Sequence, residues 1–483
     1  MRTIKAMGKL EQYLLDAVGK EKADLSLDNP YCRIGFDEDK KRLGWIGDVS
    51  FSKVKEVLEE LLPIFSGIDN FIFVGMGGSI NGIKPLISLF GNLSFYTLDN
   101  LDPLAIKGIL SKIDFLEKTL VISISKSGTT KETQLLSHAL KEKFSNSLGV
   151  AKWSRHFLWV SDEPSFKKLN NLGWEKVKKV SIQFDRKTDI GGRFSSPHTL
   201  IFMLPLFLLL DKNFIKFEKI YNDFITIKGK IRQSAYTSYK KYKDSNNAYF
   251  LPEFDSRFGD SFSAWIVQLF QESLGSKSEN FAVKTLTVDK NRNHFLSLQL
   301  DVLMDDSVVL LMSEMYFFQI FIAYYSATKN INFVNQDYVE EYKKKMQSLE
   351  KEGGCDANIT SIDLESLIKT FREKIKTDKN FIEIVLYYYP EAKVVEDIKR
   401  RFEEEFPEKN IFVFLGSDWN HQSYQAAFSD RNTLYLLLTL PFYQSEVKGI
   451  SKQTLIKNIQ TLKLIAKATY LTLEEKALFY SLK

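Results

Sequence analysis

The feature that most constrains the fold is the alternation of short apolar runs with helical segments in the first third of the chain. The apolar runs are four to six residues long, and the stretches between them carry apolar residues at helical spacing. Strands that are apolar throughout are typical of a parallel sheet covered by helices on both faces. The sequence therefore predicts an α/β fold, with its first strands at 71–74, 95–98, 119–124 and 156–160.

The second half of the chain repeats this pattern less regularly. A polar stretch at 240–247 precedes a new apolar run, which indicates a transition between sub-domains within 212–247. The run 308–327 has the composition of a buried core helix, although 307–311 alone also fits a strand. The further predicted strands are 248–251, 295–300, 307–311, 382–388, 411–415 and 433–438.

We therefore expect two α/β sub-domains, each a mainly parallel sheet flanked by helices. The first spans 46–215 and contains the hydroxyl-rich loop described below, and the second spans 216–445. Helical segments are expected before and after them, at 1–45 and 446–483.

Composition and charge exclude several classes of protein. The chain has 483 residues and a net charge of +5, too slight over this length to indicate a nucleic-acid partner. Two cysteines, Cys32 and Cys355, cannot form a disulfide framework, and no two histidines have metal-ligand spacing. The most apolar run, 200–210, is shorter than the roughly 20 residues that a membrane-spanning helix needs, and no secretory signal is visible. We expect a cytoplasmic protein with no metal and no membrane contact.

The strongest chemical signal is the segment from Ser125 to Thr133, in which five of nine residues carry hydroxyl groups. It lies between a predicted strand and a predicted helix, and a helix N-terminus offers free N–H groups and a partial positive charge. One Ser or Thr would be enough to cap that helix. The surplus of hydroxyl groups therefore favours a phosphate-binding loop.

A glycine turn from Gly75 to Ser79 follows the first predicted strand. It begins like a dinucleotide-binding fingerprint, and Asp99 follows about twenty residues on, but Ile80 occupies the last glycine position. A tight turn that needs glycine only for backbone freedom fits equally well. On this motif alone both interpretations stay open.

Two further motifs carry groups suited to proton transfer. Arg193 follows a pair of glycines and can reach over an anionic intermediate, although a surface arginine is the plainer alternative. Gln268 and Glu272 lie four residues apart and share one helix face. Burial against the apolar side of that helix would raise the pKa of Glu272 towards that of a general base, whereas a solvated glutamate is the alternative.

His421 stands in the turn after the predicted strand 411–415. Active-site residues of α/β folds collect at such strand ends. A single histidine is more often structural, so an active-site role for His421 depends on support from other motifs.

Taken together, these segments resemble the glucose-6-phosphate isomerase family, whose sub-domains are of the sugar-isomerase kind. A single motif of this kind would be weak evidence, but five in the same order are specific. Together with the lysine and histidine motifs described below, the resemblance covers about 350 residues. The five similar segments are 74–79, 100–103, 125–133, 191–195 and 268–275.

The resemblance implies a role for each matching residue. Arg193 would stabilise an enediolate, Glu272 would move the proton between C1 and C2, and Glu132 would pair with the ring-opening histidine. The family resemblance also implies a homodimer with shared active sites, and no cofactor. The residues implied to bind the sugar phosphate are Gly78, Ser79, Ser125, Lys126, Ser127, Thr130, Thr133 and Gln268.

The C-terminal half departs from the family's usual motif order. Residues 331–343 resemble the lysine motif, which assigns Lys343, and they precede 420–425, which resemble the histidine motif around His421. This order is similar to a bacterial branch in which the isomerase is fused to a transaldolase, although no segment of transaldolase length is present here. His294 and Lys452 are the alternatives for the two ring-opening residues.

The activity implied by the resemblance is the interconversion of glucose 6-phosphate and fructose 6-phosphate in glycolysis and gluconeogenesis. A non-catalytic phosphosugar sensor is the alternative, because a fold does not fix a function. The presence of both Glu272 and Arg193 favours the enzyme, since a sensor needs only the loop. Whether mannose 6-phosphate is also used stays open.

Overall fold

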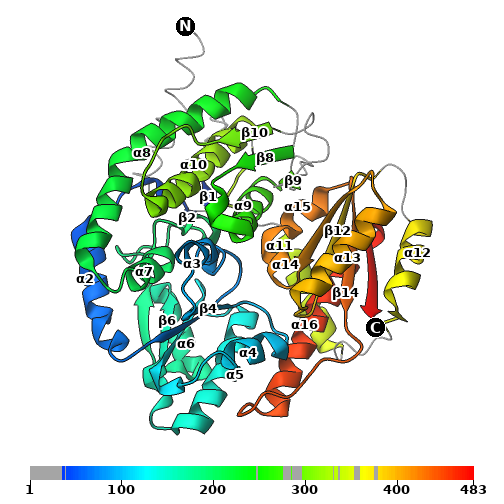
Figure 1. Cartoon of the computed structure of the whole chain (residues 1–483), viewed down its shortest axis with the longest axis horizontal. Coiled ribbons are helices and arrows are strands. Elements are labelled where there is room, and N and C mark those ends of the chain that lie inside the picture. The colour runs from blue at the N-terminus through cyan, green and yellow to red at the C-terminus, as the bar shows by residue number, and fades with distance from the viewer. Residues whose placement is uncertain are drawn as a thin grey trace.

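The computed structural model has an α/β architecture in which parallel sheets are flanked by helices, which confirms the predicted fold class (Figure 1). Two five-stranded sheets and one three-stranded sheet contain only parallel pairs among the described residues, and a short antiparallel pair, β1 (Phe36–Asp37) with β2 (Lys40–Lys41), precedes them. The structure describes residues 35–37, 40–245, 249–275, 284–285, 296–329, 331–335, 338–352, 359–374 and 379–483.

The first sheet has the strand order β4-β3-β5-β6-β7. Its strands alternate their side chains between two cores, so that Phe71 and Phe73 face one core while Ile72 and Val74 face the other. All four predicted strands are present, and the fourth begins one residue later than predicted because His156 closes a short 3₁₀ turn. The strands are β3 (Asn70–Val74), β4 (Phe95–Leu98), β5 (Thr119–Ile124), β6 (Phe157–Ser161) and β7 (Lys178–Ser181), and the helices among them are α3 (Lys84–Phe90), α4 (Pro103–Leu110), α5 (Lys131–Leu148) and α6 (Phe166–Leu169).

The second sheet has the order β11-β15-β14-β12-β13, and two helices cover its outer face (Figure 1). The last three predicted strands, 382–388, 411–415 and 433–438, all belong to it. Its strands are β11 (Ser361–Ile362), β12 (Phe381–Leu386), β13 (Asn410–Leu415), β14 (Thr433–Thr439) and β15 (Ala477–Leu482), and the outer helices are α12 (Leu364–Lys374) and α13 (Ala392–Glu405).

The C-terminal segment ends in a strand that the sequence analysis does not predict. The segment 446–483 contains the expected helix, α16 (Lys452–Leu473), but β15 follows it and pairs in parallel with β14. The run from Ala477 to Leu482 is short and partly exposed, so its own pattern is weak. The strand forms because it pairs with β14, which is buried along its whole length.

The middle of the chain forms a helical layer around the three-stranded sheet β10-β8-β9. The prediction of a strand at 307–311 is wrong, because these residues form the first turn of α10 (Ser307–Thr328), where Asp306 accepts hydrogen bonds from the backbone N–H groups of Val308 and Val309. The other elements are β8 (Tyr249–Glu253), β9 (Lys284–Thr285), β10 (Leu296–Gln299), α2 (Phe51–Leu61), α7 (Leu200–Leu209), α8 (Phe214–Tyr242) and α9 (Gly259–Leu274).

Helix α10 is long and apolar enough to cross a membrane, but 89% of its most apolar window is buried inside the fold. It therefore serves as the core helix that its composition also allows, packed against α8 and α9. These helices share one continuous core with the inner faces of β3 and β5.

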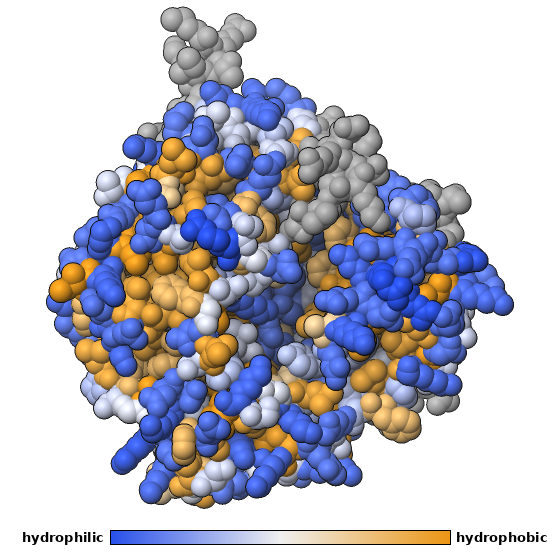
Figure 2. Space-filling view, in the orientation of Figure 1, coloured by the Kyte–Doolittle hydropathy of each residue, from blue (hydrophilic) through white to orange (hydrophobic). Residues whose placement is uncertain are grey.

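A second core lies between the two large sheets and joins them within one chain. It contains Val74 and Val121 of the first sheet and Val385 and Leu437 of the second. The helices between the sheets include α5, α11 (Val339–Lys351), α15 (Tyr424–Ser429) and α16 (Figure 1). This core brings the loops of the second sheet against those of the first. In the orientation of Figure 1, the surface is hollowed between the second sheet and the rest of the molecule, and the floor of this hollow is hydrophilic (Figure 2).

Candidate active site

The candidate site gathers at the carboxyl ends of β3 and β5, where two loops of the first sheet lie side by side. Ligands of parallel α/β sheets bind at this edge because the helix N-termini that follow the strands point towards it. The first loop is the glycine turn 75–79 and the second is the hydroxyl-rich segment that begins at Ser125.

The glycines of the first loop serve close packing against other segments of the site. Gly77 has φ +53°, and a Cβ atom there would lie 2.9 Å from both Gln268 Nε2 and His421 Cβ. A Cβ atom on Gly78 would lie 2.3 Å from the backbone of Gly192. Asp99, the residue that a dinucleotide ribose would require, is instead ion-paired with Lys84 at 2.5 Å. The geometry therefore favours the tight turn over the dinucleotide fingerprint.

The hydroxyl groups of the second loop hold its shape and open onto a cavity. Ser125 is buried and its Oγ lies 2.9 Å from Thr130 Oγ1, while the hydroxyl group of Thr129 donates to Ser127 Oγ over 3.0 Å. Ser127 and Thr130 line the cavity, together with Lys126. Thr133 is fully buried behind the loop and lines neither of the two cavities described below.

The N-terminus of α5 has no side-chain cap among the described contacts, although Thr130 occupies the capping position. The first N–H groups of the helix are therefore left for another acceptor. An anion at this position would gain from these N–H groups and from the helix dipole. The loop therefore does not act as a simple side-chain cap of α5.

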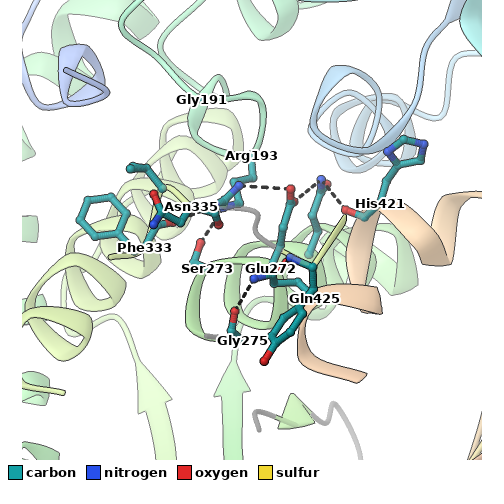
Figure 3. Close-up of polar contacts among 12 residues, drawn as sticks. Gly191, Arg193, Glu272, Ser273, Gly275, Phe333, Asn335, His421 and Gln425 are labelled. Carbon is teal, nitrogen blue, oxygen red and sulfur yellow. Dashed lines mark hydrogen bonds and ion pairs between the residues drawn. The ribbon is translucent and has the colours of Figure 1, made fainter. Parts of the chain in front are cut away.

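A buried ion pair forms the centre of the site. Arg193 Nη1 lies 3.1 Å from Glu272 Oε1 (Figure 3). Both side chains are almost fully buried. The rest of the guanidinium is held by Ser273 Oγ, which accepts from Nε over 2.8 Å, and by the backbone carbonyl groups of Phe333 and Asn335. Neither residue is on the surface, so the surface alternatives for Arg193 and Glu272 are wrong.

Gln268 connects this pair to the segment around His421. Its Nε2 donates to Glu272 Oε2 over 2.9 Å and to the backbone carbonyl of His421 over 3.1 Å. Gln268 and Glu272 lie on α9, one turn apart, as their spacing predicts. Their shared helix face thus borders the cavity.

His421 lies on a short helix, α14 (Asp418–Gln422), and pairs with Glu132 of α5, its Nε2 lying 3.1 Å from Oε1. Burial alone would lower the pKa of His421, but the hydrogen bond and the charge of Glu132 outweigh it and the pKa is raised. Lys343 opposes this rise and Asp418 adds to it. The pKa of Glu132 is correspondingly lowered, against its own burial, by His421. Both shifts favour the charged forms, an imidazolium facing a carboxylate.

Lys343 lies on α11 and borders the same cavity as His421, while its Nζ is 2.9 Å from Glu340. Lys452, the alternative lysine, is exposed at the first residue of α16 and does not line this cavity. His294, the alternative histidine, lies outside the described residues.

Two adjoining cavities make up the site and share Ser79, Gly192 and Arg193. The first has about 470 Å³ of empty space and is lined by Gly77, Gly78, Gln268, Glu272, Val339, Lys343 and His421, among others. The second has about 1220 Å³ and is lined by Arg42, Lys126, Ser127, Thr130, Asp162, Lys168 and Thr188, among others. A phosphate at the loop and a reacting carbon near Glu272 can therefore belong to one small molecule.

Several contributors to the site have no sequence signal. The carbonyl groups of Phe333 and Asn335 act through the backbone, and Arg42 comes from the segment expected to be helical. Asn81 and Asp418 join the site only through side chains on distant segments. Among the described residues, no group of three His, Cys, Asp or Glu side chains is placed to hold a metal ion.

Comparisons with known proteins find matches over part of the chain. Residues 62–234, which include both loops and Arg193, match the family model of phosphoglucose isomerase. The chain is 31% identical to a glucose-6-phosphate isomerase of Campylobacter jejuni over 48% of its length and 56% of that protein. It is 26% identical to a glucose-6-phosphate isomerase of Methanocaldococcus jannaschii over 52% of its length and 62% of that protein. The matches thus span little more than half of these relatives.

Solved structures share the fold. A glucose-6-phosphate isomerase from Chlamydia trachomatis superposes with a TM-score of 0.52 at 16% identity, over 77% of this chain and 89% of that one. A hypothetical protein from Thermus thermophilus superposes with a TM-score of 0.50 at 18% identity, over 72% of this chain and 97% of that one. At these identities the likeness concerns the architecture.

Proposed function

We propose that this chain is an aldose–ketose isomerase that interconverts glucose 6-phosphate and fructose 6-phosphate through a cis-enediolate. The observation that carries the proposal is the buried Arg193–Glu272 pair, which lies in the same cavity as His421. Glu132 pairs with His421, and the hydroxyl-rich loop lines the adjoining cavity. The relatives named as glucose-6-phosphate isomerases and the family match over 62–234 support it.

The loop would bind the phosphate. Ser127, Thr130 and Ser79 offer hydroxyl groups to the cavity, and the N-terminus of α5 offers backbone N–H groups. Lys126 adds positive charge, although burial and the nearby Arg42 lower its pKa to about 8. Ser125 supports Thr130 from behind.

The His421–Glu132 pair would open the sugar ring. The imidazolium donates a proton to the ring oxygen, the hydroxyl group on C1 passes its proton to solvent, and the C1–O5 bond breaks to give the open-chain aldehyde. The carboxylate of Glu132 would orient the imidazole, and it favours its charged form by raising the pKa of His421. Lys343, on the same cavity, would face the sugar hydroxyl groups.

Glu272 would then carry out the isomerisation. Its carboxylate removes the proton from C2, and the C1 carbonyl oxygen gains negative charge. The proton of the C2 hydroxyl group then passes to this oxygen, and protonated Glu272 delivers a proton to C1 as the C2 carbonyl forms. Arg193 stands beside Glu272 and would stabilise the enediolate charge. No electron leaves the substrate, so the reaction needs no redox cofactor.

The direct test is turnover of glucose 6-phosphate by the purified chain in D₂O. The proposal expects fructose 6-phosphate to form, with deuterium at C1, because the proton on Glu272 exchanges with solvent. Binding of the sugar phosphate without turnover or exchange would instead favour the non-catalytic sensor. The same assay with mannose 6-phosphate shows whether epimerisation at C2 also occurs.

Three features remain predictions under this proposal: the cytoplasmic location, the homodimer and the relation to the transaldolase-fused branch. The last is supported by the order of the site residues, since Lys343 precedes His421 along the chain. Both residues border one cavity, so this order is compatible with a complete site.

A further inference from the structure

A continuous set of hydrogen bonds runs behind the cavity and joins the helix of the base to the helix of the histidine. Gln268, which holds Glu272, accepts on Oε1 a hydrogen bond from Asn81 Nδ2 over 3.1 Å. The same nitrogen donates to Asp418 Oδ1 over 3.4 Å. Asn81 belongs to the loop after β3, Gln268 to α9 and Asp418 to α14. Three segments far apart in sequence are thus connected by neighbouring side chains.

Asp418 is also anchored to the first sheet by charge. Its Oδ2 lies 3.4 Å from Lys84 Nζ on α3, and it accepts a hydrogen bond from Gln422. Lys84 is also paired with Asp99 at 2.5 Å. Burial acts to lower the pKa of Lys84, but Asp418 and Asp99 outweigh it and raise that pKa. The lysine therefore stays charged and ties the start of α14 to α3.

The direction of every hydrogen bond in this set is fixed by the carboxylates at its two ends. A carboxylate only accepts, so the amide nitrogen of Asn81 must face Asp418 and the amide nitrogen of Gln268 must face Glu272. The remaining oxygen of Gln268 then faces the Asn81 nitrogen. Asn81, Gln268 and Asp418 are all buried, so water does not compete for these groups.

We propose that Asn81 and Asp418 are positioning residues that fix His421 relative to Glu272, so that the ring-opening group and the base act on one bound sugar. The proposal rests on the proposed isomerase function. Neither residue lines the two cavities, so both act through Gln268 and through the start of α14. Nothing in the resemblance to known families assigns either residue.

The histidine needs such support because its helix is short. Helix α14 has five residues, too few to hold its own orientation without tertiary contacts. The base, by contrast, lies on the 16-residue helix α9. A displacement of about 1 Å of a catalytic group can reduce turnover by about 10²-fold, so the link between the two helices has catalytic consequences.

Two variants separate the link from the charge. Asn81→Leu keeps the approximate volume and removes both hydrogen bonds of the amide nitrogen. Asp418→Asn keeps the shape but removes the charge and the requirement that both oxygens accept. The charged groups near His421 are Glu132 on α5, Lys343 on α11 and Asp418 on its own helix, while Glu272 and Arg193 border the same cavity.

Both variants are expected to lower kcat for glucose 6-phosphate by about 10 to 100-fold while KM stays near that of the wild type. The phosphate loop, which neither variant touches, maintains binding. The alkaline limb of the kcat–pH profile should move to lower pH in Asp418→Asn only, because the raising effect of Asp418 on the pKa of His421 is lost. Tyr387→Phe is the matched control, since it removes a buried 2.8 Å hydrogen bond to Asn420 on the same helix.

The outcomes distinguish this proposal from the proposed function. If the wild type does not isomerise the sugar phosphate, the proposed function fails. If the wild type is active and folded Asn81→Leu or Asp418→Asn keeps its kcat, the positioning role is wrong. An equal loss of kcat in Tyr387→Phe would also overturn it, because general loosening of α14 would then explain the effect. Should Asn81→Leu fail to fold, Asp418→Asn decides through its kcat and its pH profile.

Discussion

The two ends of the site are built in different ways. The phosphate end consists mainly of one short segment between β5 and α5, and its hydroxyl groups and N–H groups come from the loop itself. The catalytic end is assembled from α9, α11, α14 and the loop that carries Arg193, and the residues of its His421–Glu132 pair are 289 positions apart in sequence. A local segment can bind an anion alone, whereas the chemistry depends on how separate parts of the fold meet. Changes at the first end should alter KM, and changes at the second should alter kcat.

The largest effect is expected from Glu272→Gln. The amide still accepts and donates hydrogen bonds in the same space but cannot take the C2 proton, so kcat should fall by about 10²- to 10⁴-fold with little change in KM. Steady-state kinetics with glucose 6-phosphate measure both values. Glu314→Gln, at another buried glutamate that lies on α10 outside the cavities, is the matched control and should keep its kcat. Near-normal turnover in Glu272→Gln would move the base elsewhere.

His421→Ala tests whether the catalytic end is complete within one chain. Loss of the general acid should lower turnover of ring-closed glucose 6-phosphate by about 10²-fold. Because His421 and Glu272 line the same cavity of one chain, mixing His421→Ala with Glu272→Gln should restore no activity. Recovery on mixing, after the two proteins are unfolded and refolded together, would show that subunits exchange these residues, as the family resemblance implies for a homodimer.

At the phosphate end, substitutions should change KM rather than kcat. Ser127→Ala and Thr130→Val each remove one hydroxyl group that borders the cavity. A hydrogen bond to a charged group contributes about 1.5 to 3 kcal/mol, so KM should rise at least about tenfold while kcat is kept. Thr133→Val is the control, because its hydroxyl group is fully buried and lines neither cavity. A loss of kcat with unchanged KM in Ser127→Ala would contradict the division between the two ends.

The difference between the two ends also decides what the sequence could predict. The strands of the first sheet and the hydroxyl-rich loop are local patterns, and the structure contains them where predicted. The strand β15 was missed because its pairing with the buried β14 decides it. The helical start of α10 was mistaken for a strand because its apolar run fits both, and the cap at Asp306 decides for the helix. The relation of Asn81 to Asp418 spans 337 positions and has no pattern in the sequence. Motif matching could select Glu272 and His421 but could not show what holds them together.

The smallest effect should come from the pH response of the phosphate end. Asp162 borders the larger cavity near Lys126, and burial raises its pKa to about 6, with Lys126 and Arg42 opposing. Below pH 6 the carboxyl group keeps its proton and is neutral, and above pH 6 its charge repels a bound phosphate. The KM of the wild type should therefore exceed that of Asp162→Asn above pH 6 by a few-fold and equal it below about pH 5.

Comparison of the two proteins at each pH removes the contribution of the second ionisation of the substrate phosphate, which both proteins share and which has a pKa near 6. Asp223→Asn, at an exposed aspartate on α8 paired with Lys219, is the control and should match the wild type throughout. A KM ratio that does not change between pH 5 and pH 8 would mean that Asp162 lies too far from the phosphate to affect it. A change in kcat rather than KM would mean that the two ends of the site are coupled, and the division of labour between a local binding loop and an assembled catalytic end would no longer hold.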